Sequence, residues 1–153
     1  MPARSKRSLK LLVLMMLTVV QLCAAEPVAL EGTKNTRDLG GMPVAGGRLR
    51  SGRLYRSGAL CFATSGDVAK LNGLGLHTVV DLRTDKEIEK DGPDRLVLRE
   101  NLRFPMTSYH GRGAEAYRSL ILQNPQVLRE FFALLARNES YPILYHCSAG
   151  KDR

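Results

Sequence analysis

The sequence predicts an α/β fold in which helices flank a central, mostly parallel sheet. Two short runs, residues 77–81 around Val79-Val80 and the apolar residues 143–145, have the pattern of buried strands. Segments with helix start signals precede and separate these runs. Strands that alternate with helices favour a parallel sheet, and such sheets bind ligands at the carboxyl ends of their strands.

Residues 1–25 have the pattern of a signal peptide. A leader with four basic and no acidic side chains precedes an apolar stretch at residues 11–22, and small residues at 23–25 suit cleavage before Glu26. The stretch is shorter than the about 20 residues that cross a membrane, which favours an export signal over an uncleaved anchor. We expect a secreted or periplasmic protein with no stable membrane span after cleavage, and one domain at residues 26–153.

Charge and composition limit the classes of partner. Without the leader, 19 Lys and Arg stand against 15 Asp and Glu, so the net charge falls from +8 to +4. Mild positive charge suits an anionic substrate, whereas the lack of basic blocks interleaved with aromatics argues against nucleic acid. Three cysteines give no disulfide framework, and three scattered histidines suggest no metal site and no cofactor. The oligomeric state is left open.

The N-terminal half is expected to begin with extended chain. Residues 28–60 hold short β-prone pieces separated by glycines, with a hairpin at residues 48–56. Thr64 then begins a capping-box pattern, and the helix that follows should end at Gly73 and Gly75. The buried strand at 77–81 comes next.

The second half continues the alternation. Thr84 and Glu87 repeat the capping-box pattern and begin a short polar helix that stops at Gly92. A later stretch with helical periodicity, residues 125–137, has Pro125 in its first turn and apolar side chains on one face. The other expected elements are a strand at 101–106, a helix at 113–122 and the strand at 143–145.

The last apolar run leads directly into a loop of small and charged residues. Residues 146–153 read HCSAGKDR, so a cysteine and an arginine lie six positions apart. Backbone N–H groups of such a loop can point at an oxyanion, while the arginine fork binds two of its oxygens. Nearby cations also favour the thiolate, which is the nucleophilic form of cysteine. The pattern predicts attack of sulfur on phosphorus.

Three upstream segments accompany this loop: NTRDLGG at 35–41, LYRSGAL at 54–60 and VDLR at 80–83. Together with the loop they resemble the tyrosine phosphatase superfamily, in particular the bacterial and fungal branch with dual-specificity-like members and the loop H-C-x-A-G-K-D-R. The resemblance implies a phosphatase that acts on phosphotyrosine, and sometimes on phosphoserine, phosphothreonine or phosphoinositides. A phosphorylated protein or a phosphoinositide is then the expected partner.

The loop residues take distinct expected roles. Cys147 would be the nucleophile that forms a phosphocysteine, and Arg153 would bind the phosphoryl oxygens and stabilise the transition state. Asp152 would be the general acid. His146 is expected to orient the loop through a hydrogen bond of its ring. The expected substrate-binding residues are Ser148, Ala149, Gly150 and Lys151.

The assignment of the acid rests on a comparison within the resemblance. Related phosphatases take the acid from a mobile loop upstream of the cysteine. That window here contains Tyr109, His110, Arg112 and Glu115 but no Asp. The gap favours Asp152, with Glu115 as the alternative.

Four charged residues outside the loop are expected to be structural. Asp81 ends a buried strand and should accept hydrogen bonds from nearby backbone. Arg37, Asp38 and Arg56 should form a buried ion-pair set that fastens the N-terminal segment.

Two alternative functions have to be considered. In the resembled superfamily a helix follows the loop and completes the anion site with its N-terminal N–H groups. The sequence stops at Arg153, so the C-terminal helices are expected to be missing and residues 26–153 alone to be inactive. A non-catalytic phosphate-binding remnant is therefore one alternative. A rhodanese-like sulfurtransferase is another, which the arginine and the upstream segments disfavour.

Overall fold

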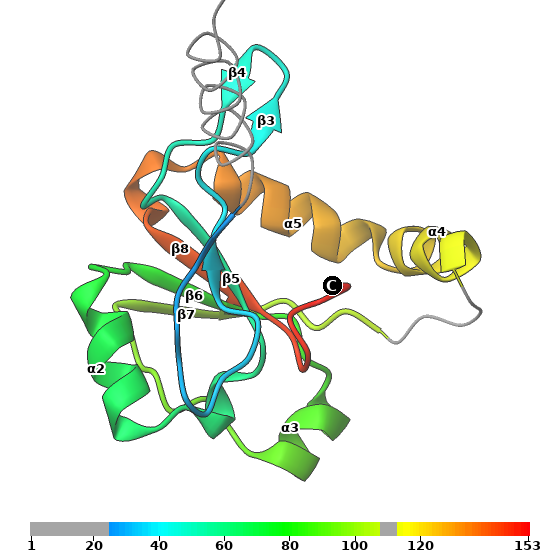
Figure 1. The fold of residues 1–153 in the computed structure, drawn as a ribbon. Coiled ribbons are helices and arrows are strands. Elements are labelled where there is room, and N and C mark those ends of the chain that lie inside the picture. The colour runs from blue at the N-terminus through cyan, green and yellow to red at the C-terminus, as the bar shows by residue number, and fades with distance from the viewer. Residues whose placement is uncertain (1–24, 108–112) are drawn as a thin grey trace, which may run out of the picture.

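The computed structural model describes residues 25–107 and 113–153 (Figure 1). Its main sheet has the strand order β1-β2-β5-β8-β6-β7. The four strands β5, β8, β6 and β7 are parallel, and β1 and β2 add antiparallel pairs at one edge. The predicted mostly parallel sheet is thus confirmed. The strands are β1 (Glu26–Pro27), β2 (Arg37–Asp38), β5 (Leu54–Ser57), β6 (Thr78–Asp81), β7 (Glu100–Arg103) and β8 (Ile143–His146).

Helices lie on both sides of this sheet (Figure 1). One side has α2 (Ser65–Gly73) and α3 (Asp85–Asp91), and the other has α4 (Gly113–Gln123) and α5 (Pro125–Leu135). Short 3-10 helices, η1 (Leu60–Phe62) and η2 (Asn138–Ser140), join the elements. Within the described residues, no helix has the length and apolar composition of a membrane span.

Two hydrophobic cores follow from the alternation of side chains along the central strands. Val79 and Leu144 are register partners and pack with α2 in the first core. Val80 and Ile143 point to the opposite face and pack with α4 and α5 in the second. The central strand β8 is therefore buried on both faces, which fixes the start of the loop that follows it.

Both predicted capping boxes are present. The Thr64 side chain accepts from Asp67 N–H while the Asp67 carboxylate accepts from Thr64 N–H, and Thr84 and Glu87 repeat the arrangement. The Asp67 carboxylate also accepts from the N–H groups of Glu31 and Gly32, at 2.7 and 2.8 Å. Burial alone would raise its pKa, but these hydrogen bonds outweigh burial and lower the pKa of Asp67 to about 2.

We expect Asp67→Ala to lower the free energy of unfolding by about 2–4 kcal/mol, because the partly buried N–H groups of Glu31, Gly32 and Thr64 lose their acceptor. Since the native pKa of Asp67 lies below its unfolded value, this contribution is present above about pH 4 and declines as the pH falls toward 2. Chemical denaturation at several pH values measures both effects. Asp85→Ala, at an exposed acidic residue in the first turn of α3, is the matched control. Equal losses in the two variants would contradict the prediction.

The predicted hairpin at residues 48–56 is wrong. The observed hairpin pairs β3 (Pro43–Val44) with β4 (Gly47–Arg48) through a turn in which Gly46 has a φ of 82°. The segment at 54–57 instead joins the main sheet between β2 and β8. Strand β7 ends at Arg103, so the predicted strand at 101–106 is shortened, although the N–H groups of Phe104 and Met106 still donate to the carbonyls of Asp81 and Leu82.

The predicted ion-pair set of Arg37, Asp38 and Arg56 is also wrong. In the antiparallel ladder Arg37 lies opposite Arg56 and Asp38 opposite Tyr55. The two guanidinium groups and the carboxylate therefore leave opposite faces of the sheet. Asp38 accepts from the N–H groups of Gly40 and Gly52, at 2.8 and 2.6 Å.

Candidate active site

The predicted site loop begins at the carboxyl end of β8. This strand lies between β5 and β6, and its last residue, His146, is the register partner of Ser57 and Asp81. The seven predicted catalytic and substrate-binding residues follow it directly, so they share one loop at the edge where parallel sheets bind ligands. Cys147 is buried, whereas Lys151 is exposed.

The loop turns back over its own cysteine. Gly150 N–H donates to Cys147 Sγ at 3.3 Å. Gly150 has a φ of 66°, and a Cβ there would come within 2.6 Å of the backbone of Ser57 and Gly58. Only glycine meets both conditions without a shift of the neighbouring chain. The small residue at this position is therefore a requirement of the loop geometry.

Neighbouring segments bind the carbonyl groups of the loop from outside. Ala59 N–H donates to the Ser148 carbonyl at 3.2 Å, and the Asn35 side chain donates to the Ala149 carbonyl at 2.7 Å. Arg37 donates to the Gly150 carbonyl at 3.4 Å. In a trans peptide the N–H points away from the C=O, so the next N–H groups along the loop point to its inner side. Such a row of N–H groups is an anion-binding nest.

Arg153 lies across the loop and is held by Glu87 of α3. Both terminal nitrogens of its guanidinium donate to the Glu87 carboxylate, with Nη1 2.7 Å from Oε2, and Nη2 also contacts Ser148 Oγ at 3.3 Å. The hydrogen bonds to Glu87 raise the pKa of Arg153 despite burial, and the neighbouring Cys147 acts in the same direction. The hydrogen bonds from Arg153 hold the pKa of Glu87 well below its usual range.

Sequence reasoning assigned Glu87 to a capping box and missed this second contact. Its Oε2 accepts from the backbone and side chain of Thr84, at 2.8 and 3.0 Å. Its Oε1 accepts from the Ser148 hydroxyl at 2.5 Å. Because β6 and β8 are parallel, the helix that follows β6 begins beside the loop that follows β8. The contact depends on this shared edge, which is known only once the two strands are paired.

Asp152 is one of the two charged residues that line a mostly apolar cavity. The Tyr117 hydroxyl, from α4, donates to Asp152 Oδ1 at 2.6 Å. The cavity of about 220 Å³ is lined by Asp152, Arg153 and apolar side chains that include several from α4 and α5. The alternative acid, Glu115, is exposed in the first turn of α4. The other residues named in that window, at positions 109, 110 and 112, lie outside the described residues.

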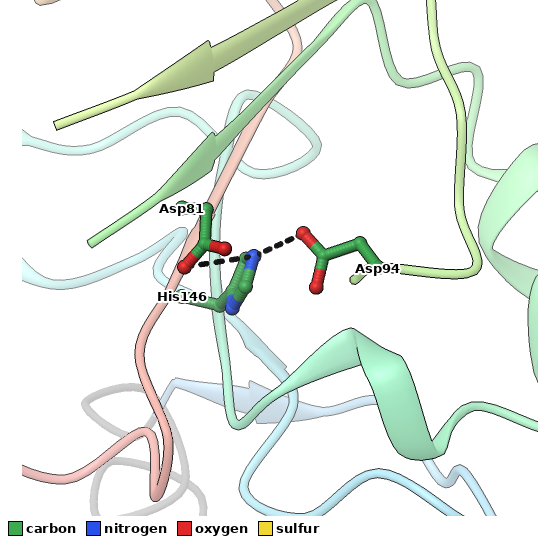
Figure 2. A group of neighbouring side chains, drawn as sticks. All are labelled: Asp81, Asp94 and His146. Atoms are coloured by element: carbon green, nitrogen blue, oxygen red, sulfur yellow. Dashed lines mark hydrogen bonds and ion pairs between the residues drawn. The ribbon is translucent and has the colours of Figure 1, made fainter. Parts of the chain in front are cut away.

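His146 has two carboxylate neighbours that are distant in sequence (Figure 2). Its Nε2 lies 2.7 Å from Asp94 Oδ2 and 3.8 Å from Asp81 Oδ1. The three side chains offer donor atoms within 4.8 Å of one another, a distance at which a cation could bind. The fully buried Arg83, however, already donates to both carboxylates. A metal ion here would lie against a buried cation, which opposes its binding.

The two cysteines in the described part of the chain have different surroundings. Cys61 and Cys147 are both free thiols. Arg83 Nη1 donates to Cys61 Sγ at 3.3 Å, yet burial raises the pKa of Cys61, so it stays protonated at neutral pH. As predicted, Asp81 accepts from nearby backbone, in this case Arg83 N–H at 2.8 Å.

Residues 28–153 match the family of proteins described as the tyrosine phosphatase family. The chain belongs to this family. A Cupriavidus necator protein named "putative tyrosine-protein phosphatase" is 33% identical over 147 residues, which cover 82% of this chain and 53% of that protein. A tyrosine-protein phosphatase of Nostoc commune is 30% identical and covers 59% of this chain and 35% of that protein. The chain thus spans about half or less of the length of these relatives.

The solved structure of P. aeruginosa TpbA is also similar to this chain. It shares 23% identity, with a TM-score of 0.38 and coverage of 84% of this chain and 62% of that chain.

Proposed function

We propose that this protein is a cysteine-dependent phosphatase that hydrolyses phosphotyrosine monoesters through a phosphocysteine at Cys147. Phosphoserine, phosphothreonine and phosphoinositide monoesters are the further candidate substrates. The observation that carries the proposal is the loop itself: Gly150 N–H bonds the buried Cys147 sulfur while the loop carbonyls bond outward. A thiol at the base of an anion nest, beside an arginine, suits attack on a phosphoryl group.

In the first proposed step the Cys147 thiolate attacks phosphorus and a sulfur–phosphorus bond forms. The bond to the ester oxygen breaks, its electron pair leaves with that oxygen, and Asp152 supplies the proton. Water then attacks phosphorus, the sulfur–phosphorus bond breaks and the thiolate is restored, while Asp152 takes a proton from the water. The inward N–H groups and Arg153 stabilise the charge on the equatorial oxygens in both steps.

Glu87 has a supporting role in this scheme. A guanidinium that binds phosphate must be held in one orientation, and Glu87 is itself fixed by the capping box of α3. Its carboxylate accepts from both terminal nitrogens of Arg153, which also contact the carbonyls of Leu82 and Met106 and the Ser148 hydroxyl. The arginine is therefore oriented before substrate arrives, which lowers the cost of ordering it during the reaction.

A substrate panel tests the proposed function. The purified protein, extended beyond residue 153 through the helix expected to follow the loop, should hydrolyse p-nitrophenyl phosphate and a phosphotyrosine peptide, and vanadate should inhibit both reactions. Phosphoserine and phosphothreonine peptides and a phosphoinositide, assayed in parallel, define the range. Transfer of sulfur from thiosulfate to cyanide without phosphate release would contradict the proposal and favour a sulfurtransferase. Binding of phosphate without hydrolysis would favour a non-catalytic module.

We also propose that the protein is secreted or periplasmic. The proposal rests on the basic leader and the apolar stretch within residues 1–25. Deletion of this segment should retain the protein in the cytoplasm of its host, as cell fractionation would measure. Unchanged export without the segment would contradict it.

A further inference from the structure

The side chain of Asp94 bonds the histidine that immediately precedes the cysteine of the loop. His146 is fully buried, and the Asp94 side chain is 15% exposed. The distance from His146 Nε2 to Asp94 Oδ2 is 2.7 Å, that of a charge-assisted hydrogen bond (Figure 2). Asp81, at 3.8 Å from the same nitrogen, is too far for a second one.

Arg83 fixes the orientation of the Asp94 carboxylate. Its Nη2 donates to Asp94 Oδ1 at 2.8 Å and to Asp81 Oδ2 at 2.9 Å. Its Nη1 donates to the Gly92 carbonyl at 3.1 Å, and its Nε to both oxygens of Asp81. Each oxygen of Asp94 thus has one assigned partner: Oδ1 accepts from Arg83 and Oδ2 faces His146. The carboxylate cannot rotate without breaking one of these contacts.

This arrangement determines where the proton of His146 resides. An ionised carboxylate has no hydrogen to donate, so the nitrogen that faces it must carry one. The other ring nitrogen, Nδ1, is buried and has no hydrogen-bond partner in the described part of the chain. A buried nitrogen without an acceptor nearby is better left as an unprotonated lone pair than as an N–H. Both observations point to the tautomer with the proton on Nε2.

We propose that Asp94 is a positioning residue of the active site: it holds the proton of His146 on Nε2 and thereby fixes the ring and the start of the loop at Cys147. The catalytic consequence rests on the proposed phosphatase function. His146 closes β8, and its carbonyl accepts from Leu82 N–H at 2.9 Å, so ring and backbone are held from two sides. A displacement of the nucleophile by about 1 Å costs on the order of 10²-fold in rate.

The variant Asp94→Asn gives a direct test because it keeps the shape of the side chain. Its amide oxygen is expected to stay with Arg83, since the reverse orientation would turn an NH2 group toward a cation. The NH2 group then faces His146 Nε2, which must accept, so the proton must move to Nδ1. Nitrogen-15 NMR of the imidazole distinguishes the two tautomers, and His77→Gln and His110→Gln spectra assign the signals of His146.

The account predicts Nε2–H in the parent protein and Nδ1–H in Asp94→Asn. The value of kcat on p-nitrophenyl phosphate should fall about 10²-fold with a smaller change in KM. Asp85→Asn, an exposed aspartate in an ion pair with Arg103, is the matched control and should change neither tautomer nor kcat. An Nδ1–H tautomer in the parent protein, or a tautomer switch with unchanged kcat, would overturn the proposal.

Two features of these experiments distinguish the positioning role of Asp94 from the alternatives. The NMR result needs no substrate, so it stands or falls independently of whether the protein is a phosphatase. Titration of the protein with Zn²⁺ after alkylation of Cys147 tests the cation alternative at the same side chains. Stoichiometric Zn²⁺ binding that Asp94→Asn removes would mean that the cluster is a metal site, and it would overturn the proposal. No Asp94-dependent binding would support it.

Discussion

Cys147→Ser is expected to abolish the hydrolysis of p-nitrophenyl phosphate, with a loss on the order of 10⁴-fold or more. Residues that act as a nucleophilic unit cause losses of this size when the nucleophile is removed. A serine hydroxyl has a much higher pKa than a thiol, so at this position it stays protonated and is a poor nucleophile. The N–H nest and Arg153 remain in the variant, so phosphate binding should persist. Steady-state kinetics and equilibrium binding of phosphate measure the two effects.

Cys61→Ser is the control for this substitution. It replaces the other described thiol, which is buried in a separate cluster beside Arg83. That variant should keep measurable hydrolysis. Comparable activity of Cys147→Ser and the parent protein would exclude Cys147 as the nucleophile.

Asp152→Asn is expected to lower kcat by about 10²–10⁴-fold on substrates with poor leaving groups, the usual contribution of a positioned general acid. The loss should be much smaller on p-nitrophenyl phosphate, because its leaving group departs without a proton. Rates over a series of phosphate esters with increasing leaving-group pKa measure this dependence. The location of Asp152 beside Arg153, with Tyr117 donating to it, suits a group that must be aimed.

Glu115→Gln provides the comparison, since Glu115 is the other carboxylate considered for the role. It is exposed in α4 and should tolerate the change. Equal losses on both kinds of ester in Asp152→Asn would mean that this residue shapes the loop instead of donating a proton. A leaving-group dependence in Glu115→Gln would transfer the role to Glu115.

Local signals in the sequence predicted most of the fold. The helix starts at Thr64 and Thr84 were predictable because a capping box involves residues three apart, and both boxes form. The central strands were predictable because each contains adjacent apolar residues, Val79-Val80 and Ile143-Leu144, as strands buried on both faces do. The mostly parallel sheet was predictable because these strands alternate with helices.

Features that depend on register were not predictable from the sequence. Arg37, Asp38 and Arg56 were expected to pair, but the ladder turns Asp38 to the face opposite the arginines. Strand lengths and register in short antiparallel segments are set by tertiary contacts, which no local pattern records. The hairpin at 43–48 was missed for the same reason.

The candidate site, like the fold, was predictable only in part. The seven loop residues lie together because they are consecutive, and the spacing of Cys147 and Arg153 was enough to predict an anion-binding loop between them. Glu87 and Asp94 reach the loop across 66 and 52 positions of sequence. Each could be recognised only after the parallel pairing of β6 and β8 had brought their segments to the same edge of the sheet.

The central claim is that phosphate is transferred to the sulfur of Cys147. The most direct measurement is to quench the reaction with acid during turnover of p-nitrophenyl phosphate and to locate any phosphate adduct by mass spectrometry of the peptide that contains Cys147. The account predicts a phosphate adduct on the Cys147 sulfur that is absent in Cys147→Ser. Turnover with no adduct, or with an adduct on a different residue, would contradict it.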